Sequence, residues 1–375
     1  MAVSRRSPEL PAADPQAAAA ADPDRARLHQ LGYKQELKRA LSVVSNFALS
    51  FSIISVMMGV TITYNTGLRY GGPVSMTLGW FVVTLFNGCV ALSMAEICSA
   101  YPTSGGLYYW SAKLAGKDWA PLASWVTGWF NIVGQWAATT SIDFSLAQLV
   151  QVIVLLGTGG LNGGGYMASK YVVLTMYGAI LVIHGLINSL PIQYMAWVGQ
   201  LGAFWNAAAV AKERASAGFI FTHFNVDDGA GIKDKAYILA LGLLMSQYSI
   251  VGYDASAHMT EETKNADWSG PMGIITSVAL SSVFGWVYLV ALTSLVTDNI
   301  PYLLDPGNDA GGHSTTPSMA ALVTVLFSLP VAYPVAADNF NYTPVLVGGV
   351  VILSVVAWVL HARFWFQGPI TNVDL

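Results

Sequence analysis

The chain has 375 residues, of which 54% are hydrophobic and only 10% are charged. Soluble proteins are about 25% charged, so this composition excludes an ordinary soluble enzyme and indicates a helical protein that crosses a membrane several times. Lys and Arg total 17 and form no long cluster, which argues against nucleic-acid binding, and the net charge of −4 says little because only charges flanking the spans set orientation.

The first 40 residues precede any apolar span. From Met1 to about Arg27 the chain is rich in Ala, Pro and Asp without a periodic apolar face, which predicts disorder. From Leu28 apolar and basic residues alternate, which favours an amphipathic lead-in on the cytoplasmic membrane surface. Seven Lys and Arg residues lie in this tail, against Arg69 alone in the first outer loop, so the positive-inside rule places the tail in the cytosol.

Two apolar spans come next, at about Leu41 to Asn65 and Gly72 to Ala95. The first has many Ser and Thr residues, which suits close helix packing or a polar cavity better than a lipid-facing anchor. Gly59, near its middle, predicts a break in the helix.

A stretch rich in Pro, Gly and aromatic residues, Glu96 to Trp110, follows the second span. Pro102 stops a helix, and Gly105 and Gly106 let the backbone turn or approach another segment closely. We therefore expect a long membrane helix to end here and an interfacial segment to begin. Cys89 and Cys98, within and just after the second span, have no partners at metal-ligand spacing.

The third span runs from about Trp119 to Leu156, which is too long for one perpendicular crossing, so we expect an interfacial start and a strong tilt. Asp143 is the one carboxylate inside it. It is either a functional intramembrane acid or a solvated residue near the outer end.

His184, in the fourth span, is interpreted as a packed histidine rather than a proton carrier. The fourth and fifth spans cover about Tyr171 to Leu190 and Ile192 to Ala211.

A polar connecting segment, residues 212–235, separates this first half, 41–211, from the second. The sixth span begins near Ala236 and includes Gly252, with Tyr248, Tyr253 and Asp254 close by. Such residues are costly in lipid and predict a broken helix that lines a cavity. The seventh span, Pro271 to Thr297, completes the region 236–297. After a loop, 298–316, the region 317–375 holds two last apolar segments, about 317–337 and 342–362, and a short tail.

The two halves share a pattern. Spans one and six each place a Gly among small polar residues, and the spans that follow begin with Gly-Pro (Gly72-Pro73 and Gly270-Pro271) and contain Gly-Trp (Gly79-Trp80 and Gly285-Trp286). Interrupted segments at corresponding positions of two halves indicate a transporter site.

Two stretches resemble a known superfamily, the amino acid–polyamine–organocation transporters. The stretch from Glu96 to Trp110 is similar to the motif after their second helix. The sixth span and its sequel are similar to their sixth-helix pattern, through Gly252, Tyr253, Asp254, Glu261, Glu262, Asn265 and Pro271. The runs LGYKQELKR and TSGGLYYWSAKLAG resemble most the plant and fungal bidirectional amino-acid and GABA permease branch. The resemblance covers about Leu31 to Thr297 and resumes in the last two segments.

This resemblance implies an all-α polytopic membrane protein with a LeuT-type inverted-repeat fold, in which two five-helix repeats are followed by two extra helices. It implies alternating-access transport of amino acids such as GABA across the plasma membrane or an endomembrane, without catalysis, cofactor or metal. The broken first helix would offer amides to the substrate carboxylate and the broken sixth helix carbonyls to the amine. The residues implied as substrate contacts are Ser55, Met58, Gly59, Val60, Tyr248, Ser249, Gly252 and Tyr253. Asp143 and Asp254 are candidates for coupling to a proton or a sodium ion.

The chain also departs from the family pattern. The first break reads Met57-Met58-Gly59 where many members have a Gly-Ser-Gly trio. The family usually has twelve helices, whereas nine apolar segments are found here. The fifth is short and helices eight to ten have no counterpart, so the second repeat is incomplete. A transport-inactive relative that acts as a regulatory or assembly subunit is therefore the alternative hypothesis.

Overall fold

The computed structural model describes residues 22–189, 215–226, 232–294, 300–301, 305, 307 and 343–369. Within these ranges the regular secondary structure is helical, apart from two isolated β-bridges. Five helical segments are long and apolar enough to cross a membrane: Val43–Arg69, Gly72–Ala100, Gly116–Gly157, Lys170–Ile187 and Ala266–Ser294. The predicted all-α polytopic membrane fold is thus confirmed at this level. The predicted segments 192–211 and 317–337 lie outside the described residues.

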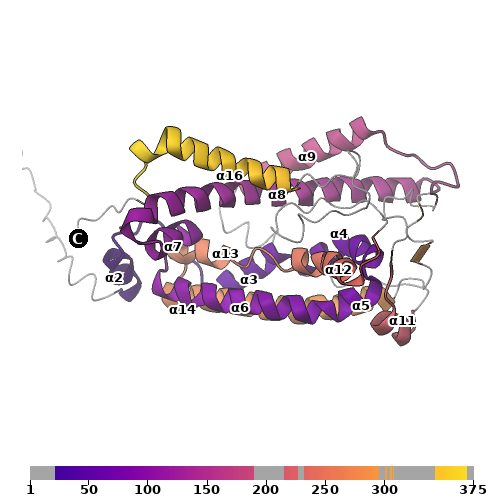
Figure 1. The fold of residues 1–375 in the computed structure, drawn as a ribbon, viewed down its shortest axis with the longest axis horizontal. Helices are drawn as coiled ribbons and strands as arrows, with labels where there is room; N and C mark the ends of the chain where they lie inside the picture. Colours follow the sequence, from indigo (N-terminus) through magenta and orange to yellow (C-terminus); the bar gives the residue numbers. More distant parts are fainter. Residues whose placement is uncertain are drawn as a thin grey trace, which may run out of the picture.

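Helix α8, Gly116–Gly157, runs along the molecule and divides it (Figure 1). At 1.5 Å per residue its 42 residues extend about 63 Å, far beyond a bilayer core of ~30 Å. Helices α9, Lys170–Asn188, and α16, Thr343–Leu360, lie on one side of it. The other long helices of the described residues lie on the opposite side, so α8 forms one wall of the helical core.

The first span is broken, as predicted, but at a different residue. Helix α3, Val43–Ile54, ends and helix α4, Val56–Arg69, begins at Ser55, which adopts a left-handed conformation with φ of 45°. Gly59 lies inside α4, so the prediction of a break at Gly59 is wrong. Its missing side chain serves packing instead, because a Cβ there would lie 2.7 Å from the Cα of Ser249.

The sixth span is broken where the sequence predicted. Helix α12, Lys235–Ser249, ends before an irregular segment in which Gly252 has φ of 87°. Glycine adopts this conformation more readily than any residue with a Cβ atom. The chain continues as the short helices α13, Ala255–His258, and η2, Thr260–Glu262. Both broken helices lie beside each other, α4 against α12 and α3 against α13 (Figure 1).

The loop after the second span also agrees with the prediction. Helix α5, Gly72–Thr77, leads into α6, Gly79–Ala100, which ends before Pro102. A new helix, α7, Gly106–Leu114, starts at Gly106, whose φ is 47°. A Cβ on Gly106 would lie 2.9 Å from the imidazole of His258, so this glycine permits close contact between the loop and α13.

Helices α6 and α14, Ala266–Ser294, pack together and carry the two Gly-Trp pairs. The indole N–H of Trp80 donates to the carbonyl of Ser282 at 2.9 Å. The indole N–H of Trp286 donates to the carbonyl of Thr77 at 3.1 Å. The two tryptophans thus make reciprocal contacts, each with the opposite helical segment.

Residues 22–27 are more ordered than predicted. Helix α2, Pro23–Gln30, starts where disorder was expected, because Asp22 caps it with its side chain and Pro occupies its first position. Leu28 and Leu31 are buried, and the Tyr109 hydroxyl donates to the Leu31 carbonyl at 3.4 Å. The predicted amphipathic lead-in therefore contacts α7. The remaining described helices are α11, Ala217–Thr222, and η5, Ala362–Phe364.

Candidate functional site

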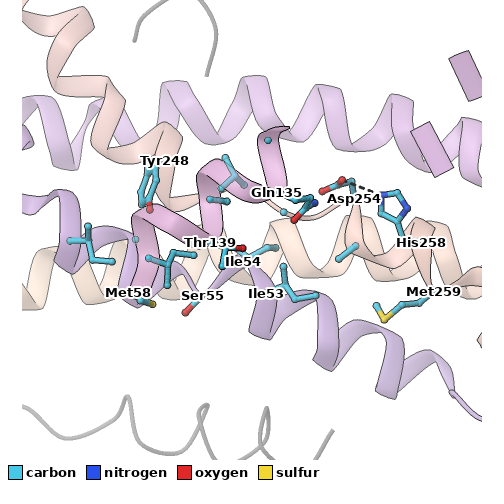
Figure 2. A pocket seen from close by; sticks show the side chains of 18 residues that line it. Ile53, Ile54, Ser55, Met58, Gln135, Thr139, Tyr248, Asp254, His258 and Met259 are labelled. Atoms are coloured by element: carbon cyan, nitrogen blue, oxygen red, sulfur yellow. Dashed lines mark ion pairs between the residues drawn. The ribbon is translucent and has the colours of Figure 1, made fainter. Parts of the chain in front are cut away.

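A cavity of about 650 Å³ lies between the two helix breaks and α8. Its volume falls within the range of small-molecule sites. Three walls come from the α3–α4 break, from the α12–α13 break and from the middle of α8 (Figure 2). The lining residues are Ile53, Ile54, Ser55, Met58, Gly59, Ile62, Gly134, Gln135, Ala138, Thr139, Ile142, Tyr248, Val251, Gly252, Asp254, Ala255, His258 and Met259.

Most of the predicted substrate contacts line this cavity: Ser55, Met58, Gly59, Tyr248 and Gly252. Three others do not. Val60 is fully buried in the core between helices. Ser249 is also buried, and its hydroxyl donates to the Met245 carbonyl at 2.7 Å. Tyr253 packs against the hydrophobic core. Val60 and Ser249 face the neighbouring helices because a helix turns each successive side chain by about 100°.

Helix ends lie beside the cavity at both breaks. Helix α4 begins at Val56 without a side-chain cap, so its first N–H groups and positive dipole end lie near Ser55. Helix α12 ends at Ser249, where the last carbonyls and the negative dipole end are found.

Asp254 and His258 lie at one end of the cavity and Tyr248 at the other (Figure 2). Nε2 of His258 is 3.5 Å from a carboxylate oxygen of Asp254. Nδ1 of His258 is 3.3 Å from the carbonyl of Ser104, in the loop before α7. The pair therefore connects the second break to the Pro- and Gly-rich loop.

The contribution of α8 was not predicted from the sequence. Gln135, Ala138, Thr139 and Ile142 recur at helical spacing and present one face to the cavity. Apart from Gln135 this face has only small or apolar residues, so its sequence resembles a packing surface. The available signal was the density of Gly, Ala and Thr in the middle of a long membrane helix.

Asp143 does not line the cavity, although the neighbouring Ile142 does. Its carboxylate is buried and lies 2.7 Å from Nδ1 of His184 on α9. The interpretation of Asp143 as a solvated residue is therefore wrong. His184 is not only a packing residue, because it binds the one carboxylate of the third span.

The other motif residues lie in helix ends and turns and are not part of the cavity lining. Glu96 lies in the last turns of α6 and Pro102 and Gly105 form the turn into α7. Glu261 and Glu262 belong to η2. The Glu262 carbonyl accepts a hydrogen bond from the Leu41 N–H at 2.8 Å, which ties the start of the first span to the end of the second break.

The chain is similar to known proteins over much of its length. Residues 41–312 match the family described as "Amino acid permease". The chain is 46% identical to "Amino-acid permease BAT1 homolog" of Oryza sativa subsp. japonica, in an alignment of 516 positions, gaps included, that spans 98% of this chain and 99% of the relative. It is 43% identical to "Amino-acid permease BAT1" of Arabidopsis thaliana, over 94% and 97% of the two chains. It is 30% identical to the "GABA-specific permease" of Saccharomyces cerevisiae, over 75% of this chain and 51% of that protein.

The match to the family covers more than half of the chain, and the resemblance seen in the two motifs extends to nearly its full length. The composition, the five membrane-length helices and the two broken helices are all consistent with an integral, multi-pass membrane protein. The family match indicates a transporter rather than an enzyme. The chain belongs to the amino acid permease family.

Proposed function

We propose that the chain transports amino acids across a membrane by alternating access, with the substrate bound in the cavity between the two helix breaks. The observation that carries the proposal is the placement of both breaks, at Ser55 and around Gly252, on the wall of one cavity. The start of α4 at the first break would suit an α-carboxylate, and the end of α12 at the second would suit an ammonium group. Transport then requires binding but no covalent chemistry.

The proposal includes a LeuT-type arrangement of inverted repeats. The two interrupted helices pack side by side, and so do the helices that follow them, α6 and α14. The reciprocal hydrogen bonds of Trp80 and Trp286 support a two-fold relation between these helix pairs. Such a relation places the substrate between the repeats, where rocking of one against the other exposes it to each side in turn.

The proposed substrates are amino acids, and GABA is one candidate because a similar yeast protein is named for it. The cavity is mainly apolar, with Asp254 and His258 at one end. GABA, whose amine lies three methylene groups from its carboxylate, is small enough to fit in a cavity of about 650 Å³. A proton or a sodium ion is proposed as the coupling ion.

A second candidate function is that of a transport-inactive subunit with a regulatory or assembly role. The alignment with the rice relative spans 516 positions, whereas the chain has only 375 residues. A large part of that relative therefore has no counterpart here. If the missing part includes a wall of the cavity, as the absence of helices eight to ten predicts, the second repeat is incomplete and alternating access fails.

Uptake into vesicles separates the two candidates. Purified full-length chain is reconstituted, and labelled neutral, acidic and basic amino acids and GABA are offered in turn. We expect uptake of at least one of them, and its loss in Gly252→Leu, because Leu strains a backbone with φ of 87° and places its side chain toward Ile53. No uptake by the wild type, with correct insertion, would favour the subunit. Unchanged uptake by Gly252→Leu would refute the site.

A further inference from the structure

Residues 22–41, the N-terminal strap, lie at the end of the molecule where α6 ends and α7 and α14 begin (Figure 1). The Arg27 guanidinium donates to the carbonyl of Ala100, the last residue of α6, at 2.8 Å. The Tyr109 hydroxyl on α7 donates to the Leu31 carbonyl at 3.4 Å. Because the positive-inside rule places this tail in the cytosol, the strap lies across the cytosolic end of these helices.

Arg39, near the end of the strap, binds the end of the broken sixth span. Its Nη1 donates to the carbonyls of Thr260 at 3.2 Å and Thr263 at 2.7 Å, in and just after η2. Carbonyls at the end of a helix lack partners within it and carry partial negative charge, so a guanidinium group stabilises them. The Arg39 side chain is only 8% exposed, so salt and water screen this contact little.

Asp24, near the start of the strap, binds the start of the seventh span with the opposite charge. Its carboxylate accepts from the N–H groups of Asn265 at 2.7 Å and Ala266 at 2.9 Å, where α14 begins. Asn265 has φ of 50°, a left-handed conformation that residues other than glycine adopt rarely. The Asp24 carboxylate also lies 3.8 Å from the Arg39 guanidinium. The two charged groups thus bind both ends of the turn between η2 and α14.

This turn is directly connected to the cavity. His258 and Met259 line the cavity, and the next residue, Thr260, provides one of the carbonyls that the guanidinium binds. Leu41, the last residue of the strap, forms an isolated β-bridge with Thr263. Helix α3 begins two residues later and ends at the first break. A movement of the strap would therefore reach both breaks.

A layer of buried polar side chains lies between the strap and the cavity. Asn46 Nδ2 donates to Thr263 Oγ1 at 2.9 Å, and the hydroxyls of Ser50 and Ser256 lie 2.6 Å apart. All four residues are fully buried. Oδ1 of Asn46 has no hydrogen-bond partner among the described residues, so the layer carries a desolvation cost that contact with water would relieve. Contacts outside the layer are therefore expected to keep it closed.

From these observations we propose that Asp24 and Arg39 are positioning residues of a cytosolic gate, which the strap keeps closed over the cavity. The inference rests on the proposed transport function. Both groups bind backbone atoms of the turn between η2 and α14, and this turn holds α13 against α3. When the two contacts break, α13 and α3 separate, the polar layer hydrates and the cavity opens to the cytosol. The strength of the two contacts sets the share of molecules in the closed form.

The test measures access to the polar layer from the cytosolic side. Ser50→Cys is placed in a background of Cys89→Ala and Cys98→Ala, which removes both natural cysteines. Sealed vesicles of known sidedness receive a membrane-impermeant thiol reagent on the cytosolic side, without amino acid. Arg39→Gln and Asp24→Ala should each raise the reaction rate about tenfold, because the loss of charge-assisted hydrogen bonds shifts an equilibrium by about that factor.

Arg27→Gln is the matched control, because Arg27 lies in the same strap but binds α6 rather than the turn. It should leave the rate unchanged. Arg39→Lys keeps the positive charge and loses the planar fork, so its rate should lie between those of wild type and Arg39→Gln. If Arg39→Gln does not insert, the smaller rise in Arg39→Lys carries the test. Reagent added on the opposite side should react no faster in any variant.

Equal cytosolic rates with the native strap and with Arg39→Gln would overturn the gate and leave the proposed transport function intact, since the labelling needs no uptake. An equal rise from both sides of the membrane would also overturn it, because it would show loss of structure rather than opening of a gate. Failure of the wild type to take up any amino acid, with a one-sided rise in Arg39→Gln and Asp24→Ala, would refute transport. It would retain the strap as the contact that closes this end of the cavity.

Discussion

At the scale of single residues, small side chains decide how closely the two broken helices approach. Gly59 faces Ser249 so closely that a methyl group would lie 2.7 Å from a backbone carbon. Real Cβ atoms do not approach other atoms to that distance, so α4 and α12 would have to move apart. Since both helices form the cavity, this one contact connects packing with binding.

Gly59→Ala should therefore lower the thermal stability of the detergent-solubilised protein, by about 1–3 kcal/mol in free energy of unfolding, and weaken amino-acid binding. The matched control is Gly178→Ala on α9, where nothing lies within 4 Å of the added methyl group. This control should be neutral or stabilising by up to about 1 kcal/mol, because Ala favours a helix over Gly. Equal melting temperatures for Gly59→Ala and wild type would contradict the close approach of Gly59 to Ser249.

At the scale of elements, the sequence predicted which helices are broken better than where each break lies. The break at Gly252 could be predicted because Tyr and Asp residues beside a Gly are costly in lipid, so this part of the span is expected to line a cavity. The first break was assigned to Gly59 because glycine adopts positive φ most easily, yet Ser55 adopts it. No local signal distinguishes Ser55 from the other serines of the span, since its conformation is imposed by the packing of α3 and α4 against α12, α13 and α14.

The wall formed by α8 and the Asp143–His184 pair were not predictable for a related reason. Each depends on which face of a long helix meets which neighbour, and hydrophobic periodicity gives no such information when all faces are apolar. Asp143 alone was visible as an unusual residue. Its partner lies 41 positions further along the chain and becomes apparent only once α8 and α9 are packed together.

The start of α14 offers a test at this scale. The Asp24 carboxylate accepts from the N–H groups of Asn265 at 2.7 Å and Ala266 at 2.9 Å, so a residue before the first span caps the helix after the sixth. Asp24→Ala should cost about 1–2 kcal/mol, because it leaves helix N–H groups without an acceptor. It should also speed hydrogen exchange in the first turn of α14. Asp22→Ala, which removes only the cap of α2, should leave α14 protected, and faster exchange in both variants alike would contradict the assignment.

At the scale of the whole molecule, two layers lie on either side of α8 (Figure 1). The layer with the broken helices holds the cavity, and the layer with α9 holds the partner of Asp143. The proposed substrate cavity and the Asp143–His184 contact thus lie on different faces of one helix. This arrangement requires a fixed orientation in the membrane, with a defined cytosolic side.

The distribution of Lys and Arg sets that orientation. Seven of them lie between Met1 and Arg39, so this tail is expected on the cytosolic side. In sealed vesicles of known sidedness, a tag at the N-terminus should be cleaved by protease added to the cytosolic side only. Carbonate extraction should leave the chain in the membrane. Cleavage of the tag from the opposite side would reverse the assignment of every span that follows.

The central claim is that an amino acid binds in the cavity between the breaks. It is tested most directly by substrate protection of Thr139→Cys, placed on the α8 wall, in a Cys89→Ala background, where the remaining Cys98 is buried. Ser145→Cys, on the same helix but outside the cavity lining, is the control. At least one amino acid should slow reaction of a thiol reagent at position 139 and leave position 145 unaffected. Equal rates at position 139 with and without each amino acid, up to saturating concentrations, would contradict the account.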